Sequence, residues 1–356
     1  MGRRASSAPT IKDVAWCAEV SVGTVSRVLK GMPDVDAELK RRVEEAIRDL
    51  GYRSSGFRLA TARREQARVI AFVLCNESGL SAAHEHLLLG IEEYCSEAKY
   101  CLLFARHQYE PNADPIELQL PEVLLNDGLA ECVIVAGGNY DNFLSALDAK
   151  GISYVLLANH IAHSQPQPEH KNQVRYNDFG GFQEATNYLI QLGHKHIWYI
   201  GDTSRPWFLN RYEGYLAAMA SHGLEPRAHT VALSDDPYEN GQAAVSYILE
   251  QNWPLTAVMA GSDDLAFGTR EALRHAGRNV PHDVSLIGFE NQLRRSHAVN
   301  LTSVCVDMAE VGRQMAKMAI ARIQPGGKDM SEIIVPATLV KRSTCRPVRT
   351  EESMVL

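Results

Sequence analysis

Residues 10–31, TIKDVAWCAEVSVGTVSRVLKG, decide the fold of the amino-terminal part of the chain. Four apolar residues have the i, i+3, i+4, i+7 spacing of one helical face: Ile11, Val14, Ala15 and Ala18. Thr10 and Asp13 have the spacing of a capping box, which marks the start of a helix. The pattern therefore predicts a short helix that begins directly after Thr10.

A second helix is predicted after a tight turn. Ser21 has the position of its N-cap, and Gly31 can end it in a left-handed conformation. Its apolar face consists of Val25, Val28 and Leu29. Two short helices this close along the chain must cross, which favours a helix-turn-helix whose second helix presents its first residues to the major groove of DNA. An ordinary helical hairpin is the alternative.

Side chains that project outward from the second helix are the candidates for contacts with DNA. Arg27 can donate a bidentate pair of hydrogen bonds to a guanine. With the caps included, the DNA-binding candidates are Thr10, Ser21, Val22, Gly23, Thr24, Ser26 and Arg27.

The segments TIKDVA, VS and TVSRVL resemble the amino terminus of the lactose-repressor (LacI) family of bacterial transcription regulators. Two positions depart from the family pattern. Glu19 stands in the turn where the family usually has Gly or Asn, so a left-handed backbone there would be strained. Gly23 stands where the family usually offers a longer side chain to a base, so we expect Val22 and Arg27 to carry more of the sequence preference.

A third helix is predicted within residues 32–52, with Asp36 as its N-cap and Gly51 as its terminator. Its buried stripe is Leu39, Val43, Ala46, Ile47 and Leu50. The basic residues Lys40, Arg41 and Arg42 are expected either to meet DNA phosphates or to stay solvated. Three helices close a small core.

A basic connector of small residues follows the third helix. The resemblance implies that it becomes a short helix on DNA and inserts a leucine into the minor groove, which kinks the site. Leu59 is the only leucine available for this role. A disordered linker with Leu59 packed on the body is the alternative.

Composition is compatible with a small module joined to a large one. The chain has 356 residues, of which 45% are hydrophobic, but no apolar run reaches membrane-spanning length. The start MGRRASSAP lacks the apolar segment of a secretory signal, so we expect a cytoplasmic, nucleoid-associated protein without membrane contact. The seven cysteines are scattered and never form a C-x-x-C pair, which favours neither a disulfide framework nor a zinc site.

Charge is distributed unevenly along the chain. Residues 1–64 hold 13 Lys and Arg against 8 Asp and Glu, a net charge of +5, and the remainder holds 23 against 35, a net charge of −12. A basic head on an acidic body is typical of a nucleic-acid-binding module joined to a metabolic domain, although a solvated charged face gives the same count.

From Val69 onward, short apolar runs alternate with amphipathic helical stretches. The runs are VIAFVL, CLLFA, CVIVA, YVLLA, HIWYIG, TAVMAG and VSLIGF. Strands this apolar are covered on both faces, so we predict two successive parallel sheets flanked by helices. No G-x-G-x-x-G segment follows a strand and no P-loop occurs, so no nucleotide cofactor is expected.

This body also resembles the effector domain of the LacI family, which is similar to periplasmic sugar-binding proteins with two lobes around a cleft. Matching stretches include YLIQLGHKHIWYIGD, SDDLAFG, VPHDVSLIGFEN and VPATLVKRST. The resemblance implies a helix-turn-helix head at 1–53, a hinge at 54–68, a bilobal body at 69–346 and a tail at 347–356. Lobe one is expected at about 69–160 and 292–323, and lobe two at about 161–291 and 324–346.

The effector is expected where the carboxyl ends of the strands of both sheets face each other. Arg211 matches the family's effector-binding arginine and can fork onto vicinal hydroxyls or a carboxylate. Asp263, Glu290 and Asn159 follow strands and can bind a polyol. Three aromatic residues are predicted either to stack on the apolar face of a sugar or to belong to the core: Trp207, Phe208 and Tyr238.

Catalysis is not expected. The histidine pairs His84/His86, His160/His163 and His194/His196 lack a third and fourth ligand at a recognisable spacing, and no G-x-S-x-G elbow occurs. We therefore expect no catalytic residue, no metal site and no cofactor.

The sequence as a whole predicts a homodimeric DNA-binding regulator, most simply a repressor, that senses a sugar, polyol or related metabolite. Two heads are needed because a pseudo-palindromic operator presents two half-sites. Helices within 85–99 and 268–279 are the candidates for the dimer face. The alternative is a cytoplasmic sugar-binding or sugar-processing protein whose head mediates protein contacts.

Overall fold

The computed structural model describes residues 10–29, 32, 35–50, 68–125, 129–162, 172–291, 300–324, 326–327 and 332–348. The chain divides into two compact units, Met1–Arg68 and Val69–Leu356, which we call the head and the body. Predictions for Gly31, Gly51, Leu59 and the tail fall outside the described residues. No helix in the described part of the chain is long and apolar enough to cross a membrane.

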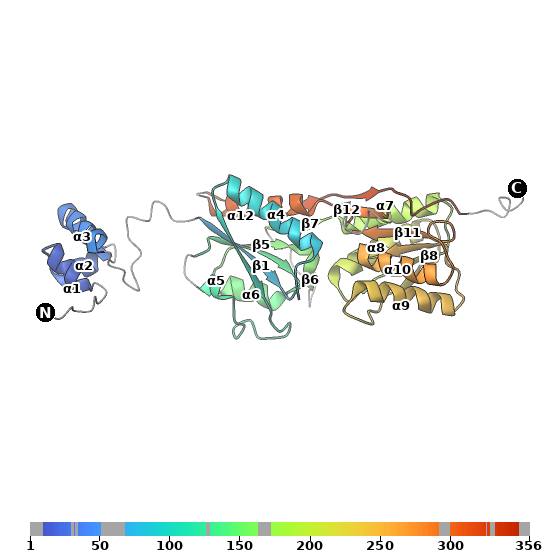
Figure 1. Ribbon diagram of the computed structural model, residues 1–356, viewed down its shortest axis with the longest axis horizontal. Helices are drawn as coiled ribbons and strands as arrows, with labels where there is room; N and C mark the ends of the chain where they lie inside the picture. The colour runs from blue at the N-terminus through green and yellow to red at the C-terminus, as the bar shows by residue number, and fades with distance from the viewer. Residues whose placement is uncertain are drawn as a thin grey trace, which may run out of the picture. The chain divides into compact units, whose positions relative to one another are not determined.

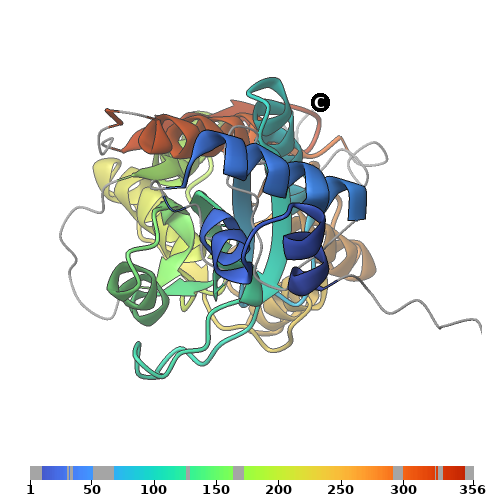
Figure 2. The ribbon, with the colours of Figure 1, turned by 90° about the vertical axis from the view of Figure 1, so that its left-hand side faces the viewer.

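The head contains the three expected helices, α1 (Ile11–Cys17), α2 (Val22–Leu29) and α3 (Ala37–Leu50). Figure 2 shows them as the dark blue and blue ribbons, with α3 the longest. Each helix contributes to one apolar core, whose buried members are Val14, Ala15, Ala18, Val25, Val28, Val43, Ala46 and Ile47. The helical spacing of apolar residues predicted all of these buried members, whereas Ile11 and Leu50 are only partly buried and Leu39 lies outside this core.

The turn between α1 and α2 contains a left-handed residue at Glu19, the position where the LacI family usually has Gly or Asn. Glu19 has a φ of 51°, a conformation that glycine or asparagine adopts at lower cost. Arg42 of α3 reaches across to this turn and donates to the Ala18 carbonyl at 2.7 Å and to the Glu19 carboxylate at 3.1 Å. This contact satisfies a carbonyl at the end of α1 and gives Arg42 a structural role.

The body contains two six-stranded sheets (Figure 1). The first is entirely parallel and consists, in spatial order, of β13 (Ile333–Val335), β7 (Gln173–Tyr176), β5 (Tyr154–Leu157), β3 (Cys132–Gly137), β1 (Val69–Cys75) and β2 (Cys101–His107). The second consists of β14 (Ala337–Val340), β12 (Thr302–Val306), β11 (Ser285–Phe289), β10 (Ala257–Ala260), β8 (Ile197–Ile200) and β9 (Arg227–His229). Only β14 runs antiparallel to its neighbour in that sheet. A small ribbon of β4 (Asn139–Tyr140) and β6 (Ile161–Ala162) completes the strands, and η2 (Ala158–His160) is a single 3₁₀ turn.

Helices cover both faces of each sheet, as strands of this apolar character require. On the first sheet, α4 (Ala82–Glu97) and α12 (Met308–Ile323) lie opposite α5 (Glu122–Leu125) and α6 (Asp141–Ala149) (Figure 1). On the second, α7 (Asp178–Gln191) and α8 (Pro206–Ser221) lie opposite α9 (Pro237–Glu250) and α10 (Asp263–His275). Successive side chains of β8 point to opposite faces of the sheet. Tyr199 packs in the core beneath α7 and α8, and Trp198 packs in the core beneath α9 and α10.

The helix pairs approach one another through glycine. A Cβ at Gly90 of α4 would overlap the Ala309 backbone of α12, and one at Gly312 of α12 would overlap the Leu87 carbonyl of α4. Gly241 and Gly268 meet the opposite helix in the same way where α9 crosses α10. These crossings therefore depend on the absence of a side chain.

The chain passes between the sheets at places other than those expected. It crosses at Asn177 after β7, at Asp307 after β12 and at Pro336 after β13. The expected boundaries placed β7 and β13 in lobe two and β12 in lobe one, and the sheet order reverses all three. The two misplaced strands of the first sheet are short, and only every second residue of β7 is buried, so neither has the long apolar run that marks a central strand.

Candidate functional site

The start of α2 is exposed on the head, at Ser21, Val22 and Gly23. Ser21 caps this helix, since its hydroxyl accepts from the Thr24 amide at 3.0 Å and lies 2.9 Å from the Thr24 hydroxyl. At the start of α1, the Thr10 hydroxyl donates to Asp13 at 2.7 Å. The hydroxyls of these three candidates are thus already bound within the head, and all three support helix ends.

The outward-facing candidates are Val22, Gly23 and Arg27, all exposed, while Ser26 is half-buried. On α3, Arg41 is ion-paired with Glu38 at 2.6 Å and Glu45 at 2.8 Å. Among the exposed outward-facing candidates, Arg27 is the one whose side chain carries hydrogen-bond donors.

Replacing Gly23 by alanine is expected to stabilise the head. A Cβ at this position meets only the Ser21 Oγ, at an ordinary contact distance of 3.5 Å, so the fold does not require glycine. Glycine within a helix costs about 0.5–1 kcal/mol relative to alanine, and hydrogen exchange of the α2 amides in the full chain measures the gain. Faster exchange in the variant would show that the backbone of α2 needs glycine after all.

A cavity of about 250 Å³ lies between the two lobes of the body. Lobe one contributes Glu77, Ser81, His84, His86, Tyr176 and Met308. Lobe two contributes Arg205, Trp207, Phe208, Arg211, Pro237, Ser262, Asp264, Phe289, Glu290 and Asn291. Many of these residues lie just after the carboxyl end of a strand, where parallel sheets place their ligands. We call this cavity the cleft.

Arg211 is the buried cation of the cleft, with only 2% of its surface exposed. Its Nη1 donates to the Gly261 carbonyl at 2.5 Å, and its guanidinium lies 3.6 Å from the centre of the Phe289 ring. Burial raises the pKa of the nearby Asp178, and the positive charge of Arg211 opposes that rise. Among the described residues, neither the Nε of Arg211 nor the Oδ2 of Asp178 has a hydrogen-bond partner. A hydroxyl or a water can satisfy such atoms, because it both accepts and donates.

The structure brings four of the seven effector candidates to the cleft: Trp207, Phe208, Arg211 and Glu290. Glu290 has a φ of 105° and is followed by Asn291, which also has a positive φ of 56°. Asn291 is held by the Ser303 hydroxyl and by Arg342. Strained backbone of this kind is characteristic of ligand sites whose surroundings hold it in place.

The other three candidates do not line the cleft. Asp263 is fully buried inside lobe two and accepts from the Ser303 hydroxyl at 2.7 Å. Asn159 binds both backbone atoms of Tyr176, its Oδ1 at 2.8 Å and its Nδ2 at 2.9 Å, so its amide fixes the end of β7. Tyr238 packs against the α9–α10 core. Position after a strand brought Asp263 and Asn159 near the correct edge of the sheet but did not determine where their side chains point.

Sequence reasoning missed most of the lobe-one wall and two charged residues of lobe two, Arg205 and Asp264. Asp264 follows Asp263 directly, and successive residues of a helix point in different directions, so one carboxylate faces the core and its neighbour the cleft. Tyr176 ends β7, which the boundaries implied by the resemblance placed in lobe two and which pairs within the first sheet instead. The sequence SAAH carried a usable signal, since Ser81 and His84 have capping-box spacing at the start of α4.

His84 is buried and neutral at the cleft. Its Nδ1 accepts from the Ser81 amide at 3.3 Å, and burial lowers its pKa to about 4. A histidine whose pKa is lower in the folded than in the unfolded chain costs stability as the pH falls below its unfolded value of 6.5. Protonation also removes the acceptor that caps α4.

Acidification is therefore expected to destabilise the body. Between pH 7 and pH 5 the free energy of unfolding should fall by about 2 kcal/mol through His84 alone. Urea unfolding at the two pH values measures the difference, and His84→Gln should remove that part of it. An equal pH dependence in both proteins would assign the effect to other groups.

No group of three or more His, Cys, Asp or Glu side chains within the described ranges is arranged to hold a metal ion. His194, one of the paired histidines, lies instead between the Ser285 hydroxyl at 2.9 Å and the Arg346 carbonyl at 3.0 Å.

Both the head and the body match known protein families. Residues 10–55 match the lacI family of bacterial regulatory proteins, and residues 186–345 match the periplasmic binding protein-like domain. Catabolite control protein A of Priestia megaterium is 28% identical over 340 residues, which cover 95% of this chain and 99% of that protein. The HTH-type transcriptional repressor CytR of Escherichia coli K12 is 27% identical over 350 residues, covering 97% and 98%.

Solved structures of similar proteins agree with the fold. A transcriptional regulator CelR–cellobiose complex superposes with a TM-score of 0.66 at 26% identity, covering 94% of this chain and 99% of that one. The lac repressor dimer bound to operator and the anti-inducer ONPF gives a TM-score of 0.67 at 19% identity, covering 96% and 100%, and this likeness concerns the fold alone.

Proposed function

This chain belongs to the lacI family of bacterial regulatory proteins, and on that basis we propose that it is a transcriptional repressor whose affinity for operator DNA is set by a sugar-like effector. The observation that carries the proposal is a polar cleft with a buried arginine, Arg211, on the same chain as a helix-turn-helix head. The named relatives are regulators, which favours binding without catalysis. Such a protein acts in the cytoplasm, at the nucleoid.

The proposed mechanism uses the cleft as a sensor. A polyol that reaches Ser81 and His84 on lobe one and Arg211 on lobe two has contacts in both lobes only when the lobes are close together. The effector changes operator affinity only if it prefers one lobe arrangement, and a tenfold preference is worth about 1.4 kcal/mol.

We propose a homodimer, because one three-helix head covers too little DNA for useful specificity. The α4 side of lobe one supports the first of the two expected faces. Leu89 on α4 is 54% exposed and Phe104 on the edge strand β2 is 39% exposed, whereas the end of α10 carries Glu271, Arg274 and His275. We also propose that Leu59 of the connector inserts into the minor groove of the operator and kinks the DNA.

Binding of labelled duplexes selected from genomic DNA tests the proposal. A protein that neutralises several phosphates releases counterions, so its affinity should fall by about 10³-fold or more between 50 and 200 mM salt. A head that mediates protein contacts instead would show no preference for any duplex over random competitor at either salt concentration.

Replacing Arg27 by alanine should weaken binding to the selected duplex by about 10- to 100-fold, because a bidentate contact with guanine is worth about 1–3 kcal/mol. Arg41→Ala is the matched control, since Arg41 is ion-paired on α3. Competition titrations at one salt concentration measure both variants. Equal losses would mean that Arg27 contributes only its charge.

A further inference from the structure

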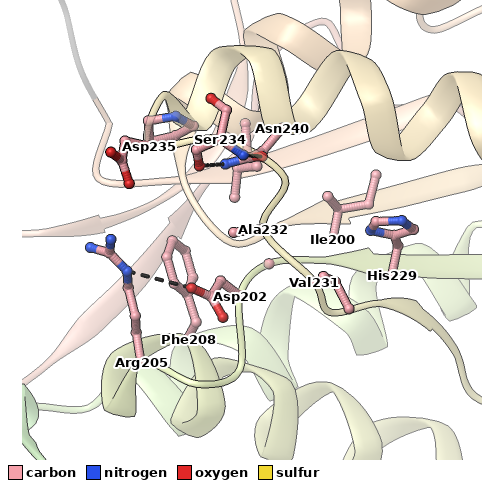
Figure 3. Close-up of a pocket in the computed structure, with 13 residues that line it drawn as sticks. Ile200, Asp202, Arg205, Phe208, His229, Val231, Ala232, Ser234, Asp235 and Asn240 are labelled. Carbon is pink, nitrogen blue, oxygen red and sulfur yellow. Dashed lines mark hydrogen bonds and ion pairs between the residues drawn. The ribbon is translucent and has the colours of Figure 1, made fainter.

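A smaller chamber of about 60 Å³ opens inside lobe two beside the cleft (Figure 3). It lies between the loop after β8 and the loop after β9, and it shares Arg205, Phe208 and Pro237 with the cleft. Figure 3 shows Arg205 and Asp235 at one end and Ile200, His229 and Val231 at the other. The chamber therefore adjoins the cleft across these shared residues and has room for a substituent of a few atoms.

Internal hydrogen bonds fix the shape of the chamber. The Asn240 side-chain amide holds the middle of the loop after β9. Its Oδ1 accepts from the Leu233 and Ser234 amides at 2.7 and 2.9 Å, and its Nδ2 donates to the Ser234 carbonyl at 2.7 Å. On the other side, Asp202 accepts from the Ser204 amide and hydroxyl at 3.1 and 2.6 Å. Both loops are thus held in place without a ligand.

The chamber wall carries more negative than positive charge. Among the described residues that line it, Asp202 and Asp235 are the carboxylates and Arg205 is the one permanent cation. The Nε of Arg205 lies 3.5 Å from the Asp202 carboxylate and its guanidinium lies 5.6 Å from the centre of the Trp207 ring, so its charge is already engaged. Burial lowers the pKa of His229, which keeps that ring neutral at pH 7.

Asp235 is the acceptor of the chamber that is left for a ligand. Its side chain is exposed, and within the described part of the chain it has no hydrogen-bond or ion-pair partner. In the adjoining cleft, Glu77, Asp264 and Glu290 also outnumber the basic pair Arg205 and Arg211. Carboxylates accept hydrogen bonds and repel anions, which defines the chemistry of a fitting group.

We propose that this chamber is a subsite for a hydrogen-bond-donating substituent of the effector, a hydroxyl or an amine, and that it rejects phosphate and carboxylate groups. The inference rests on the proposed function and narrows it to neutral or amine-bearing saccharides. Sugar phosphates and sugar acids are thereby excluded as effectors.

A matched panel tests the proposal on the full chain. Each hexose and pentose is presented as the neutral sugar, the amino sugar, the phosphate ester and the sugar acid, and dissociation constants are measured by calorimetry. We expect binding by neutral or amino members only. Asp235→Asn should raise the dissociation constant of the amino sugar by roughly fivefold more than that of the neutral sugar. An effect of this size is typical of an exposed charge pair. Glu250→Gln is the control, because it removes one negative charge from α9 outside the chamber and the cleft.

A second variant, Ala232→Trp, fills the chamber and should remove the difference between substituted and unsubstituted sugars while leaving the cleft open. The proposal is overturned if a phosphate ester or a sugar acid binds best, if no saccharide binds, or if Asp235→Asn and Glu250→Gln behave alike. Salt-dependent operator binding by the same preparation separates these failures from a failure of the proposed function.

Discussion

Replacing Arg211 by methionine is expected to abolish the response of operator binding to effector while operator binding itself persists. Methionine retains much of the apolar volume but removes the donors of a buried cation, so the Gly261 carbonyl loses its partner and Asp178 loses the neighbouring positive charge. The effector dissociation constant should rise by 100-fold or more, since charge-assisted hydrogen bonds to a ligand in a buried site are worth about 1.5–3 kcal/mol each. Titration of the operator complex with effector measures the loss.

Stability has to be followed in the same experiment. Loss of the buried hydrogen bond should lower the free energy of unfolding by about 1–3 kcal/mol, so thermal unfolding must show that the variant is folded at the assay temperature. Arg205→Met is the comparison, because Arg205 lines the same cleft and is half exposed. If Arg211→Met loses operator binding and effector binding together while remaining folded, the two sites are not separable.

Gly90→Ala is expected to destabilise the body by about 3 kcal/mol or more. The new Cβ would overlap the backbone of Ala309 on α12, and backbone at a helix crossing cannot rotate away as a flexible side chain does. Urea unfolding of lobe one measures the change. Gly79→Ala is the matched control, because a Cβ there has no neighbour within 4 Å. A loss of less than 1 kcal/mol at Gly90 would mean that α4 and α12 can separate at little cost.

Periodic signals predicted the fold well where burial repeats regularly. The caps and apolar faces of the head, and the central strands covered on both sides, follow directly from spacing. The crossings between lobes did not follow, because β7 and β13 are short edge-side strands whose membership depends on pairing with distant residues. Long-range pairing of this kind leaves no local pattern.

The cleft was predicted in part for a similar reason. Arg211 and Glu290 came from family likeness and strand position, and both line the cleft. Asp263 and Asn159 have the same kind of position, yet one binds Ser303 and the other binds the backbone of Tyr176. Whether a polar side chain after a strand turns to the ligand or supports its neighbour depends on tertiary contacts.

The three covalent links between the lobes place the pivot at one margin of the body. β7 and β13 are paired, and the Asn177 amide donates to the Val335 carbonyl at 2.9 Å, so two of the links are tied together. β1 and β8, which lead to Glu77 and Arg205, lie three or more strands from these links, a lever arm of about 14 Å. When one lobe rotates about this pivot, the walls of the cleft near the pivot move little. The walls near Glu77 and Arg205 move most, so ligand atoms there contact a different arrangement in each state. A molecule that fills only the pivot side should therefore compete for the site without switching it.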